Sequence, residues 1–317
     1  MNLDSKIFIA GHRGLVGAAI TQELGRRGYK NLLVKTHQEL DLTDQQSVKK
    51  FFEDNRPDYV FLAAAKVGGI LANATYQAQF IYENLMIEAN VLHHAYLTEV
   101  KKLLFLGSSC IYPKFSKQPI QESELLSGYL EPSNDAYAIA KIAGIKMCSA
   151  YNKQFNTDYL ALMPTNLYGP NDSRDLLNSH VLPALMRKIH DAKISGSKEV
   201  TIWGSGKPHR EFLYSEDLAD ACVFFMEKIS AKDCDGPVNI GVGADVTISE
   251  LADILAKEIG YRGKFIYDSS KPDGTPRKLL DVSKQKKFGW KPRVSLQDGI
   301  RQTYEWYLKE EKTQSPQ

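Results

Sequence analysis

Cysteine is scarce in this sequence. The 317 residues include four cysteines, Cys110, Cys148, Cys222 and Cys234, and no two of them have the C-x-x-C spacing of a structural zinc site. Disulfide-stabilised secreted proteins carry cysteines at a much higher density. The cysteine content therefore excludes a disulfide-stapled fold and gives no reason to expect a bound metal. It predicts a reducing compartment, which we expect to be the cytoplasm.

The sequence also lacks an excess of charge of either sign and any long apolar run. Its 40 basic and 38 acidic side chains leave a formal net charge of +2 and are scattered along the chain. No basic stripe therefore predicts binding to nucleic acid or to a membrane surface. No apolar run reaches membrane-spanning length, and the start, MNLDSKIFIAG, shows no basic segment followed by an apolar signal core. We expect a globular protein without a membrane segment.

What the sequence does contain is an alternation of short apolar runs with helix-length amphipathic segments. The runs KIFIAG, NLLVKT, YVFLAAA, KLLFLGSS and YLALMPTNLYG are nearly unbroken in apolar character, which is typical of parallel strands that helices cover on both faces. We expect helices to begin near Gly14 and to run over about residues 76–99 and 135–155. The pattern predicts an α/β protein with a Rossmann-like, doubly wound parallel sheet.

The character of the chain changes after Tyr168. Loops rich in Gly, Pro, Asn, Asp and Ser follow, namely GPNDSRDLLNSH, WGSGKPHREF and KPDGTPRKLLD. The apolar run VNIGVG, residues 238–243, lies between the last two loops and is expected to return to the main sheet. The predicted division is a dinucleotide-binding domain of residues 1–169 plus about 211–245, and a smaller, mostly helical C-terminal substrate domain of about 170–210 plus 246–317.

A glycine-rich turn, IFIAGHRGLVG, connects the first predicted strand to the first predicted helix. Because Gly11, Gly14 and Gly17 have no Cβ atoms, the turn can tighten and its backbone can approach a pyrophosphate at the helix N-terminus. The spacing G-x-x-G-x-x-G departs from the G-x-G-x-x-G fingerprint, and a tight turn without a ligand is the plain alternative. The combination of strand, glycines and helix favours dinucleotide binding.

The second predicted strand ends in VKTHQEL, where an NAD-binding protein would offer a carboxylate to the ribose hydroxyls. This chain has Lys35 and His37 there, and Arg13 extends from the glycine turn. Cationic side chains attract a 2′-phosphate, which a carboxylate would repel. The predicted cofactor is therefore NADP(H) rather than NAD(H), although each of the three side chains could also simply be solvated.

Tyr137 and Lys141, in DAYAIAKIAG, are spaced i and i+4 and so lie on one face of a helix. An unperturbed tyrosine has a pKa of about 10, and a nearby ammonium favours its phenolate. Ser108, at the end of a predicted strand, adds a third polar group that could hold a carbonyl oxygen. Alone, a Tyr-x-x-x-Lys pair usually marks a solvated helix face; together with Ser108 and the glycine turn it becomes a strong signal of a functional site.

The glycine turn, GSSCIYPK and YAIAK together resemble the extended short-chain dehydrogenase/reductases. The stretches GHRGLVG, AAAKVGGI, LGSSCIYPK, MPTNLYGP, NSHVLPAL, WGSGKPHREF and KPDGTPRKLLD are similar to the branch of that family that acts on GDP-4-keto-6-deoxy-D-mannose. The resemblance implies epimerisation of that substrate at C3 and C5, then reduction of its C4 ketone with NADPH to give GDP-L-fucose. It also implies a homodimer packed through the helices near 76–99 and 135–155.

The resemblance implies roles for five side chains. The C4 ketone acidifies the protons on C3 and C5, so one acid–base pair, Cys110 and His180, could invert both centres through enolates. Tyr137 would give a proton to the C4 oxygen, Lys141 would tune Tyr137 and hold the nicotinamide ribose, and Ser108 would hydrogen-bond the C4 oxygen. Neighbouring positive charge is expected to favour the thiolate of Cys110. From the residues alone, Cys110 could be a small core residue, as we expect of the other three cysteines, and His180 could begin a helix.

The same resemblance implies which residues hold the two ligands. Lys188 stands where an arginine is expected, so it keeps the charge and gives up bidentate phosphate geometry. The residues expected to contact the diphosphate and guanosine are Lys188, Trp203, Arg210, Asp273, Arg277 and Lys278. Those expected to contact the cofactor are Gly11, His12, Arg13, Gly14, Leu15, Val16, Gly17, His37, Asp41, Leu42, Lys141, Pro164, Thr165, Asn166, Leu167 and His180.

Two other interpretations stay open from the sequence. The first is another nucleotide-sugar enzyme of the same family. A 4,6-dehydratase would carry an acidic pair just after Ser108, where this chain has Ser109 and Cys110, and a 4-epimerase would show no net use of NADPH. The second is a non-catalytic redox sensor that only binds a dinucleotide, which would have no need of Ser108, Tyr137 and Lys141 together.

Overall fold

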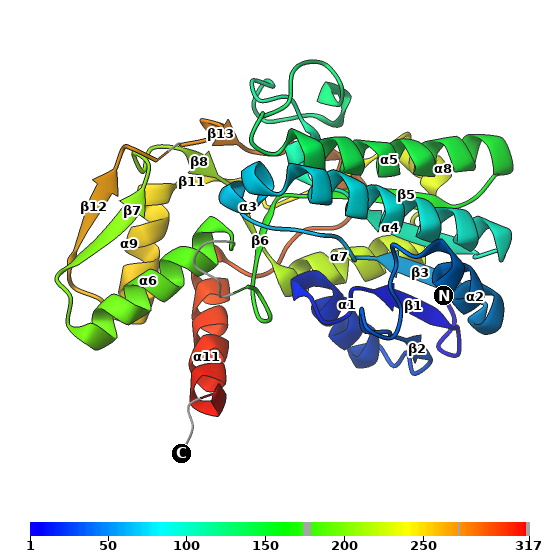
Figure 1. The fold of residues 1–317 in the computed structure, drawn as a ribbon, viewed down its shortest axis with the longest axis horizontal. Coiled ribbons are helices and arrows are strands. Elements are labelled where there is room, and N and C mark those ends of the chain that lie inside the picture. The colour runs from blue at the N-terminus through cyan, green and yellow to red at the C-terminus, as the bar shows by residue number, and fades with distance from the viewer. Residues whose placement is uncertain (174–178, 272, 315–317) are drawn as a thin grey trace.

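The computed structural model describes residues 1–173, 179–271 and 273–314. A six-stranded sheet in the order β10-β5-β4-β3-β1-β2 forms the centre of its larger part (Figure 1). All neighbouring strands in this sheet run parallel, which confirms the predicted doubly wound fold. The strands are β1 (Ile7–Ala10), β2 (Leu32–Leu33), β3 (Tyr59–Leu62), β4 (Lys102–Leu106), β5 (Tyr159–Pro164) and β10 (Val238–Ile240).

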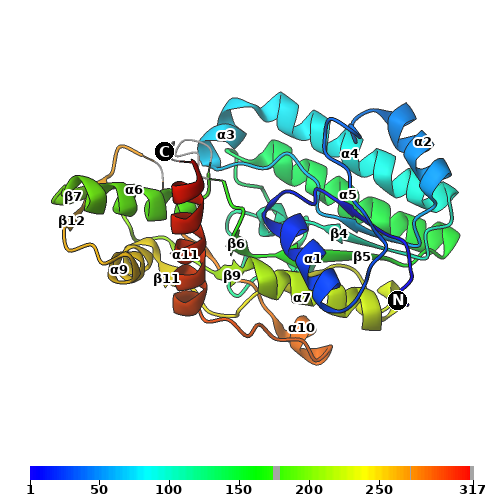
Figure 2. The same ribbon diagram turned by 90° about the horizontal axis from the view of Figure 1, so that it is seen from below.

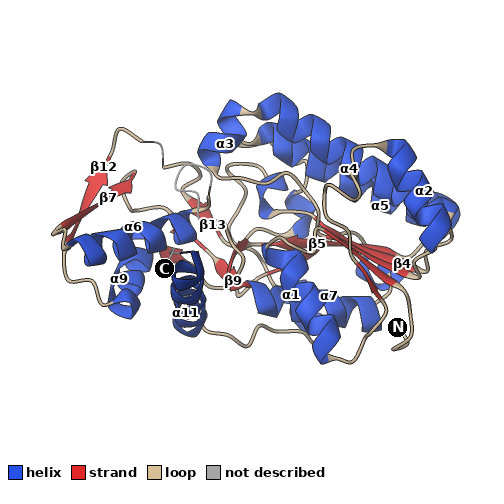
Figure 3. Ribbon diagram, turned by 60° about the horizontal axis from the view of Figure 1, so that its bottom comes forward, coloured by secondary structure: helices blue, strands red, loops and turns tan. Residues whose placement is uncertain are grey.

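Helices cover both faces of the sheet (Figures 2 and 3). The side chains of β1 alternate between two cores: Phe8 and Ala10 belong to one, and Ile7 and Ile9 belong to the other. This period of two explains why the strands read as unbroken apolar runs. No helix within the described ranges is long and apolar enough to cross a membrane. The covering helices are α2 (Gln45–Asn55), α4 (Gln77–Leu97) and α5 (Asp135–Phe155) on one face, and α1 (Leu15–Arg26) and α7 (Ser215–Lys228) on the other.

The predicted helices are confirmed, but two predicted strands are shorter than expected. Of the run NLLVKT, only Leu32–Leu33 form a strand, β2. The run YLALMPTNLYG divides into β5 and a second strand, β6 (Asn166–Tyr168), which pairs with β9 (Phe212–Tyr214) outside the main sheet. Apolar character continues past the end of β5 because the half-buried Leu167 packs against a core of the larger part and the buried Tyr168 belongs to the core of the smaller part.

The smaller part has a core of its own, built around three helices. The chain enters α9 through a capping box, in which the Thr247 and Glu250 side chains each bond the other's backbone N–H, and Leu251, Leu255 and Ile259 then face the core. The two small sheets beside these helices were not predicted. The elements are α6 (Val181–Ser195), α9 (Ile248–Ile259) and α11 (Leu296–Gln314), with β7 (Glu199–Trp203) and β12 (Lys264–Asp268) in one sheet and β8 (His209–Arg210), β11 (Val246–Thr247) and β13 (Arg277–Lys278) in the other.

Five short elements complete the described chain: α3 (Ile70–Thr75), α8 (Ala231–Cys234), α10 (Ser283–Lys287) and two 3₁₀ helices, η1 (Ser109–Ile111) and η2 (Glu122–Glu124). Residues 174–178 of the predicted loop GPNDSRDLLNSH and Pro272 of KPDGTPRKLLD lie outside the described residues. Cys148, Cys222 and Cys234 are buried and unbonded to one another, so their prediction as core residues is confirmed.

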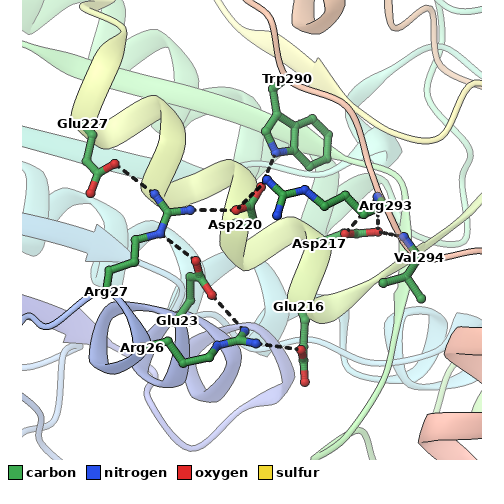
Figure 4. Close-up of polar contacts among 10 residues, drawn as sticks. All are labelled: Glu23, Arg26, Arg27, Glu216, Asp217, Asp220, Glu227, Trp290, Arg293 and Val294. Atoms are coloured by element: carbon green, nitrogen blue, oxygen red, sulfur yellow. Dashed lines mark hydrogen bonds and ion pairs between the residues drawn. The ribbon is translucent and has the colours of Figure 1, made fainter.

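A network of charged side chains ties α1 to α7 (Figure 4). The guanidinium of Arg27 at the end of α1 lies 2.6 Å from Glu23, 2.7 Å from Asp220 and 2.9 Å from Glu227. The indole N–H of Trp290 donates to the same Asp220 at 2.8 Å, which fixes the segment that leads into α11. The network holds the helix that follows the glycine turn against the sheet.

Candidate active site

A cavity of about 790 Å³ extends from the glycine turn to the smaller part of the molecule. It opens at the carboxyl ends of the parallel strands, where doubly wound folds bind ligands. Four predicted residues, His12, Arg13, Lys141 and Arg277, are not among the described residues that line it. The predicted residues that do line it are Gly11, Gly14, Leu15, Val16, Gly17, Lys35, His37, Asp41, Leu42, Ser108, Cys110, Tyr137, Pro164, Thr165, Asn166, Leu167, His180, Lys188, Trp203, Arg210, Asp273 and Lys278.

The glycine turn fits a pyrophosphate. Gly11 has φ +86°, and a Cβ atom there would lie 2.8 Å from the backbone nitrogen of Ala64, while one at Gly17 would overlap the Gly11 carbonyl. At Gly14 the nearest described atom to an added Cβ would be 3.5 Å away, so the fold itself does not require glycine there. Since Gly14 faces the cavity, its missing side chain leaves room for a ligand. The first turn of α1 has no described side-chain cap or acidic residue, so its N–H groups can bind an anion.

The end of the second strand offers positive charge to the cavity. Lys35 and His37 line it with exposed side chains. The nearby Glu39 carboxylate is turned back on its own loop, where the Thr36 N–H and hydroxyl both donate to it at 2.8 Å. These hydrogen bonds lower the pKa of Glu39, and the charges of Lys35 and Arg13 act in the same direction. Lys35 lies 3.9 Å from the Glu39 carboxylate and His37 lies 3.9 Å from that of Asp41, so a 2′-phosphate would compete with these carboxylates for both side chains.

Tyr137, on α5, lines the cavity and packs edge-on against Phe80 with ring centroids 6.2 Å apart. Desolvation raises the pKa of Tyr137, and the charges of Cys110 and Glu88 add to the rise, while a hydrogen bond with Ser108 opposes it. The residue is therefore a neutral phenol at pH 7, a state that suits a proton donor.

Lys141 lies one turn further along α5 and is buried. Its ammonium is 3.0 Å from the carboxylate of Glu88, 4.7 Å from the ring centroid of Phe105 and 5.9 Å from that of Tyr137. The predicted phenolate of Tyr137 is therefore not the form favoured here, because the ammonium faces a carboxylate instead. The predicted contact of Lys141 with the nicotinamide ribose stays a prediction.

Glu88 is a residue that the sequence reasoning missed. It lies on α4 and is 1% exposed, and desolvation raises its pKa while Lys141 opposes the rise. A Cβ atom at Gly144, on the facing helix, would lie 2.7 Å from the Glu88 carboxylate, so glycine there allows the close approach. The signal was present in the sequence: Asn84, Glu88, Val91 and Ala95 form a helical row, and all four are buried. A carboxylate in such a row requires a buried partner.

Cys110 belongs to η1, directly after β4. Its backbone N–H donates to the hydroxyl oxygen of Ser108 at 3.3 Å, and its thiol faces the cavity. The ammonium of Lys278, on β13, lies 3.6 Å from the sulfur. Arg210, on β8, also interacts electrostatically with Cys110. Two cations from the smaller part of the molecule thus face the thiol, and the expectation of neighbouring positive charge is met.

His180 is the residue immediately before α6, and its side chain is exposed to the cavity. Desolvation by the cavity walls lowers the pKa of His180, and the charge of Lys278 acts in the same direction. The imidazole is therefore neutral at pH 7, so it can accept a proton, and it becomes a proton donor once it has been protonated. Lys278 is adjacent to both members of the predicted acid–base pair.

The far end of the cavity presents an aromatic surface with two cations. The Trp203 ring is 44% exposed, and the ammonium groups of Lys188 and Lys271 lie 4.9 and 5.5 Å from its centroid. Lys188 also donates to the Thr201 carbonyl at 3.2 Å. Lys271 was not predicted. This surface suits a planar base or sugar beside a phosphate.

Arg210 and Asp273 line that end of the cavity, and Arg277 precedes Lys278 on the nearby strand β13. The Asp273 carboxylate accepts from the N–H and hydroxyl of Ser205, both at 2.7 Å. The backbone carbonyl oxygen of Asp273 lies 3.4 Å from the Arg210 guanidinium. Arg277 points elsewhere and makes a bidentate contact of 2.6 and 3.0 Å with Asp245. The predicted substrate contact of Arg277 therefore needs a rearrangement, whereas Arg210 and Asp273 line the cavity and their substrate contacts stay predictions.

Glu211 is a second residue that the sequence reasoning missed, and it joins the two parts. Its buried carboxylate accepts from the backbone N–H of Val242 at 2.6 Å and of Leu280 at 3.0 Å. Desolvation raises its pKa, and these hydrogen bonds oppose the rise. Its carbonyl accepts from Thr165 and Asn166, two predicted cofactor residues. No spacing in the sequence could have indicated these contacts.

Across the described ranges, no group of three or more His, Cys, Asp or Glu side chains could hold a metal ion.

The chain is similar to known proteins over most of its length. Residues 7–241 match the model of the NAD dependent epimerase/dehydratase family. Over 305 residues the chain is 60% identical to GDP-L-fucose synthase 1 of Arabidopsis thaliana, covering 96% of this chain and 94% of that protein. It is 53% identical over 309 residues to GDP-L-fucose synthase of Escherichia coli (strain K12), covering 96% of each. A solved GDP-mannoheptose C4 reductase of Campylobacter jejuni with NADP bound is similar at a TM-score of 0.90 and 43% identity, covering 97% of this chain and 99% of that one.

Proposed function

Because the chain belongs to the NAD dependent epimerase/dehydratase family, we propose that it converts GDP-4-keto-6-deoxy-D-mannose into GDP-L-fucose with NADPH. One observation carries the proposal: Cys110 and His180 line the same cavity as Ser108 and Tyr137. A simple reductase needs only the second set. The full-length relatives named GDP-L-fucose synthase, at 53 and 60% identity, support the same function.

The chain has a place for NADP(H) at the glycine turn. The pyrophosphate would lie over Gly14 and the N-terminus of α1, and the 2′-phosphate would face Lys35 and His37. When bound, the cofactor supplies the hydride for C4 of the sugar.

Epimerisation would be the work of Cys110 and His180. As a thiolate, Cys110 takes the proton from C3 or C5, and His180 delivers a proton to the opposite face of the same carbon. Negative charge develops on the C4 oxygen, where Ser108 and Tyr137 can donate hydrogen bonds. Because C3 and C5 flank the same carbonyl, one pair can serve both carbons.

Reduction would then use Tyr137 as the acid. Its raised pKa keeps the proton on the phenol until an alkoxide of higher basicity forms at C4. Ser108 holds the same oxygen throughout. Lys141, one turn after Tyr137 on α5, can stabilise the Tyr137 phenolate that remains after the proton has left. Its ammonium stays paired with the Glu88 carboxylate during this step.

The test is to supply the purified protein with GDP-4-keto-6-deoxy-D-mannose and NADPH and to identify the product by NMR. We expect GDP-L-fucose and one NADPH oxidised for each molecule formed. A 6-deoxy sugar with C3 and C5 uninverted would show a reductase without epimerase activity. No NADPH oxidation with this substrate would contradict the proposal as a whole.

We also propose that residues 1–169 with about 211–245 bind the cofactor and that about 170–210 with 246–317 bind the nucleotide sugar. The six-stranded sheet supports the first assignment, and the separate core of the smaller part supports the second. Hydrogen exchange should show that NADPH alone protects the first set of residues and that GDP protects the second.

We place the protein in the cytoplasm, which its four free cysteines support. Cell fractionation tests this.

A homodimer is proposed through α4 and α5. Large apolar side chains are exposed on both helices, Tyr82 and Leu97 on α4 and Ile139 and Phe155 on α5, and such surfaces often form interfaces. Light scattering should give twice the mass of one chain. Ile139→Glu should lower that mass to one chain's, and a monomeric parent protein would contradict the proposal.

A further inference from the structure

Lys278 is expected, by resemblance, to contact the nucleotide sugar, yet its ammonium lies 3.6 Å from the Cys110 sulfur. We propose that Lys278 is a positioning residue that stabilises the thiolate of Cys110 before substrate binds. The inference deepens the proposed function and rests on it for the identity of the reaction. The pairing itself is a property of the protein without ligands, so it can be tested separately.

The chemistry explains why such a partner is needed. An ordinary thiol has a pKa of about 8.5 and is mostly protonated at neutral pH, and only the thiolate can act as a base. A positive charge within about 4–6 Å favours the ionised form. In the reaction, the C–H bond at C3 or C5 breaks, an S–H bond forms, and the electron pair moves to the C4 oxygen as an enolate. His180, once it has taken a proton from solvent, gives that proton to the other face of the carbon, and the Cys110 thiol then returns its proton to solvent. Lys278 stays charged throughout.

The fold holds Lys278 in place without any ligand. Strand β13 pairs in parallel with β8, which sets Lys278 beside Arg210. The preceding residue, Arg277, is fixed by its bidentate contact with Asp245. Two residues further on, the N–H of Leu280 donates to the buried Glu211. A flexible lysine is thus attached to a backbone that is anchored on both sides.

The other charged groups around the thiol do not cancel this effect. From β8, Arg210 adds a second positive charge that interacts with Cys110. From α5, Tyr137 faces the thiol as a neutral phenol, and from α6, His180 faces Lys278 as a neutral imidazole. The acidic groups that act on Arg210 are themselves engaged: Glu131 pairs with Lys114 at 2.7 Å, and Asp273 accepts from Ser205.

The test measures alkylation of Cys110 by iodoacetamide, without substrate or cofactor, from about pH 6 to about pH 10, with the modified peptide quantified by mass spectrometry. Cys148, Cys222 and Cys234 are at most 2% exposed, and Cys110→Ala identifies any reaction at those sites. In Lys278→Met the rate of alkylation of Cys110 at neutral pH should fall about tenfold, because the charge that faces the sulfur is lost. Lys278→Arg should keep the parent profile, because it keeps the charge.

Lys264→Met is the matched control, since Lys264 is an exposed lysine on β12, and it should leave the profile unchanged. Circular dichroism confirms that each variant is folded. If Lys278→Met does not fold, Lys278→Gln takes its place. If a folded Lys278→Met or Lys278→Gln variant showed the parent pH profile of alkylation, the proposal would be overturned. This includes the outcome in which the variant only raises the KM for the nucleotide sugar.

Turnover separates this proposal from the proposed function. In deuterated water with substrate, Lys278→Met should exchange the C3 and C5 protons about tenfold more slowly at neutral pH and recover toward the parent rate as the pH rises. If the parent protein exchanges neither proton, the proposed function fails while the alkylation result for Lys278 still stands. If the exchange rate of Lys278→Met stays low at every pH, Lys278 does not act through the thiol.

Discussion

The cavity contains two sets of residues that the fold positions in different ways: a reduction group of Ser108, Tyr137 and Lys141, and an epimerisation group of Cys110, His180 and Lys278. Ser108 follows β4, and Tyr137 and Lys141 lie on α5, which packs on the same sheet. The Rossmann-like part alone therefore positions all three side chains. Cys110 follows the same strand, but His180 precedes α6 and Lys278 lies on β13. This second group exists only when the two parts of the molecule are in contact. In the proposed mechanism, reduction therefore depends on one layer of the fold, and epimerisation depends on the junction between two parts.

The two groups also differ in how charge is arranged. In the reduction group the cation, Lys141, is buried against Glu88, and desolvation keeps the proton on Tyr137. In the epimerisation group the cation, Lys278, faces the thiol directly. The proposed mechanism uses this difference: Tyr137, which is desolvated, would act as the proton donor, and Cys110, which faces a positive charge, would act as the proton acceptor in the same cavity.

The largest effect should come from removing the thiol. Cys110→Ala should slow deuterium entry at C3 and C5 by roughly 10⁴-fold, the upper end for loss of a positioned base. Reduction should persist, because Ser108, Tyr137 and Lys141 are untouched, and should give an uninverted 6-deoxy sugar. NMR of the product measures both. The control is Cys148→Ala, which truncates a buried thiol that does not line the cavity and should leave exchange intact. Exchange at the parent rate in folded Cys110→Ala would remove the thiol from the mechanism.

The converse variant is Tyr137→Phe, which removes the acid of the reduction group. NADPH oxidation should fall roughly 10²- to 10³-fold because no proton is delivered to the C4 oxygen. Deuterium should still enter at C3 and C5, more slowly because one hydrogen bond to the enolate oxygen is lost. If exchange stopped together with reduction, the two groups would not be separable as described.

Glu88→Gln should disturb the reduction group by removing the carboxylate that pairs with Lys141. It leaves the Lys141 ammonium buried without a counter-charge, which costs about 3 to 5 kcal/mol of unfolding free energy. Urea denaturation measures this loss. Glu83→Gln is the matched control on the same helix, because its partner Lys66 is partly exposed and the pair contributes under about 1 kcal/mol. Equal losses in the two variants would show that the buried pair has no special weight.

The smallest effect concerns the cofactor end, which both groups share. Arg13→Ala should weaken NADPH binding about tenfold and leave NADH binding unchanged, because one charge-assisted contact with the 2′-phosphate contributes about 1.5 to 3 kcal/mol. Fluorescence titration with each cofactor measures the ratio. Equal affinities of the parent protein for NADPH and NADH would contradict the proposed preference.

Much of the fold could be predicted because its signals are local. The apolar runs, the glycine turn and the i, i+4 spacing of Tyr137 and Lys141 depend on residues a few positions apart. The break between β5 and β6 was missed because a run that stays buried keeps its apolar character when the chain changes sheet. Glu88 could have been found from its helical row, but Glu211 could not, since it bonds backbone groups of distant segments.

By itself the sequence determined the parallel sheet, the turn that would receive a pyrophosphate and the helix that carries Tyr137 and Lys141, because helix and strand periodicity is written into neighbouring residues. Only the tertiary structure decided which charges meet. Lys278 and Cys110 are 168 positions apart, and the contact depends on the path of the whole chain between them. The burial of Lys141 against Glu88 likewise depends on how two helices pack. Electrostatic interactions act through space over a few ångströms, so spacing along the chain does not reveal them.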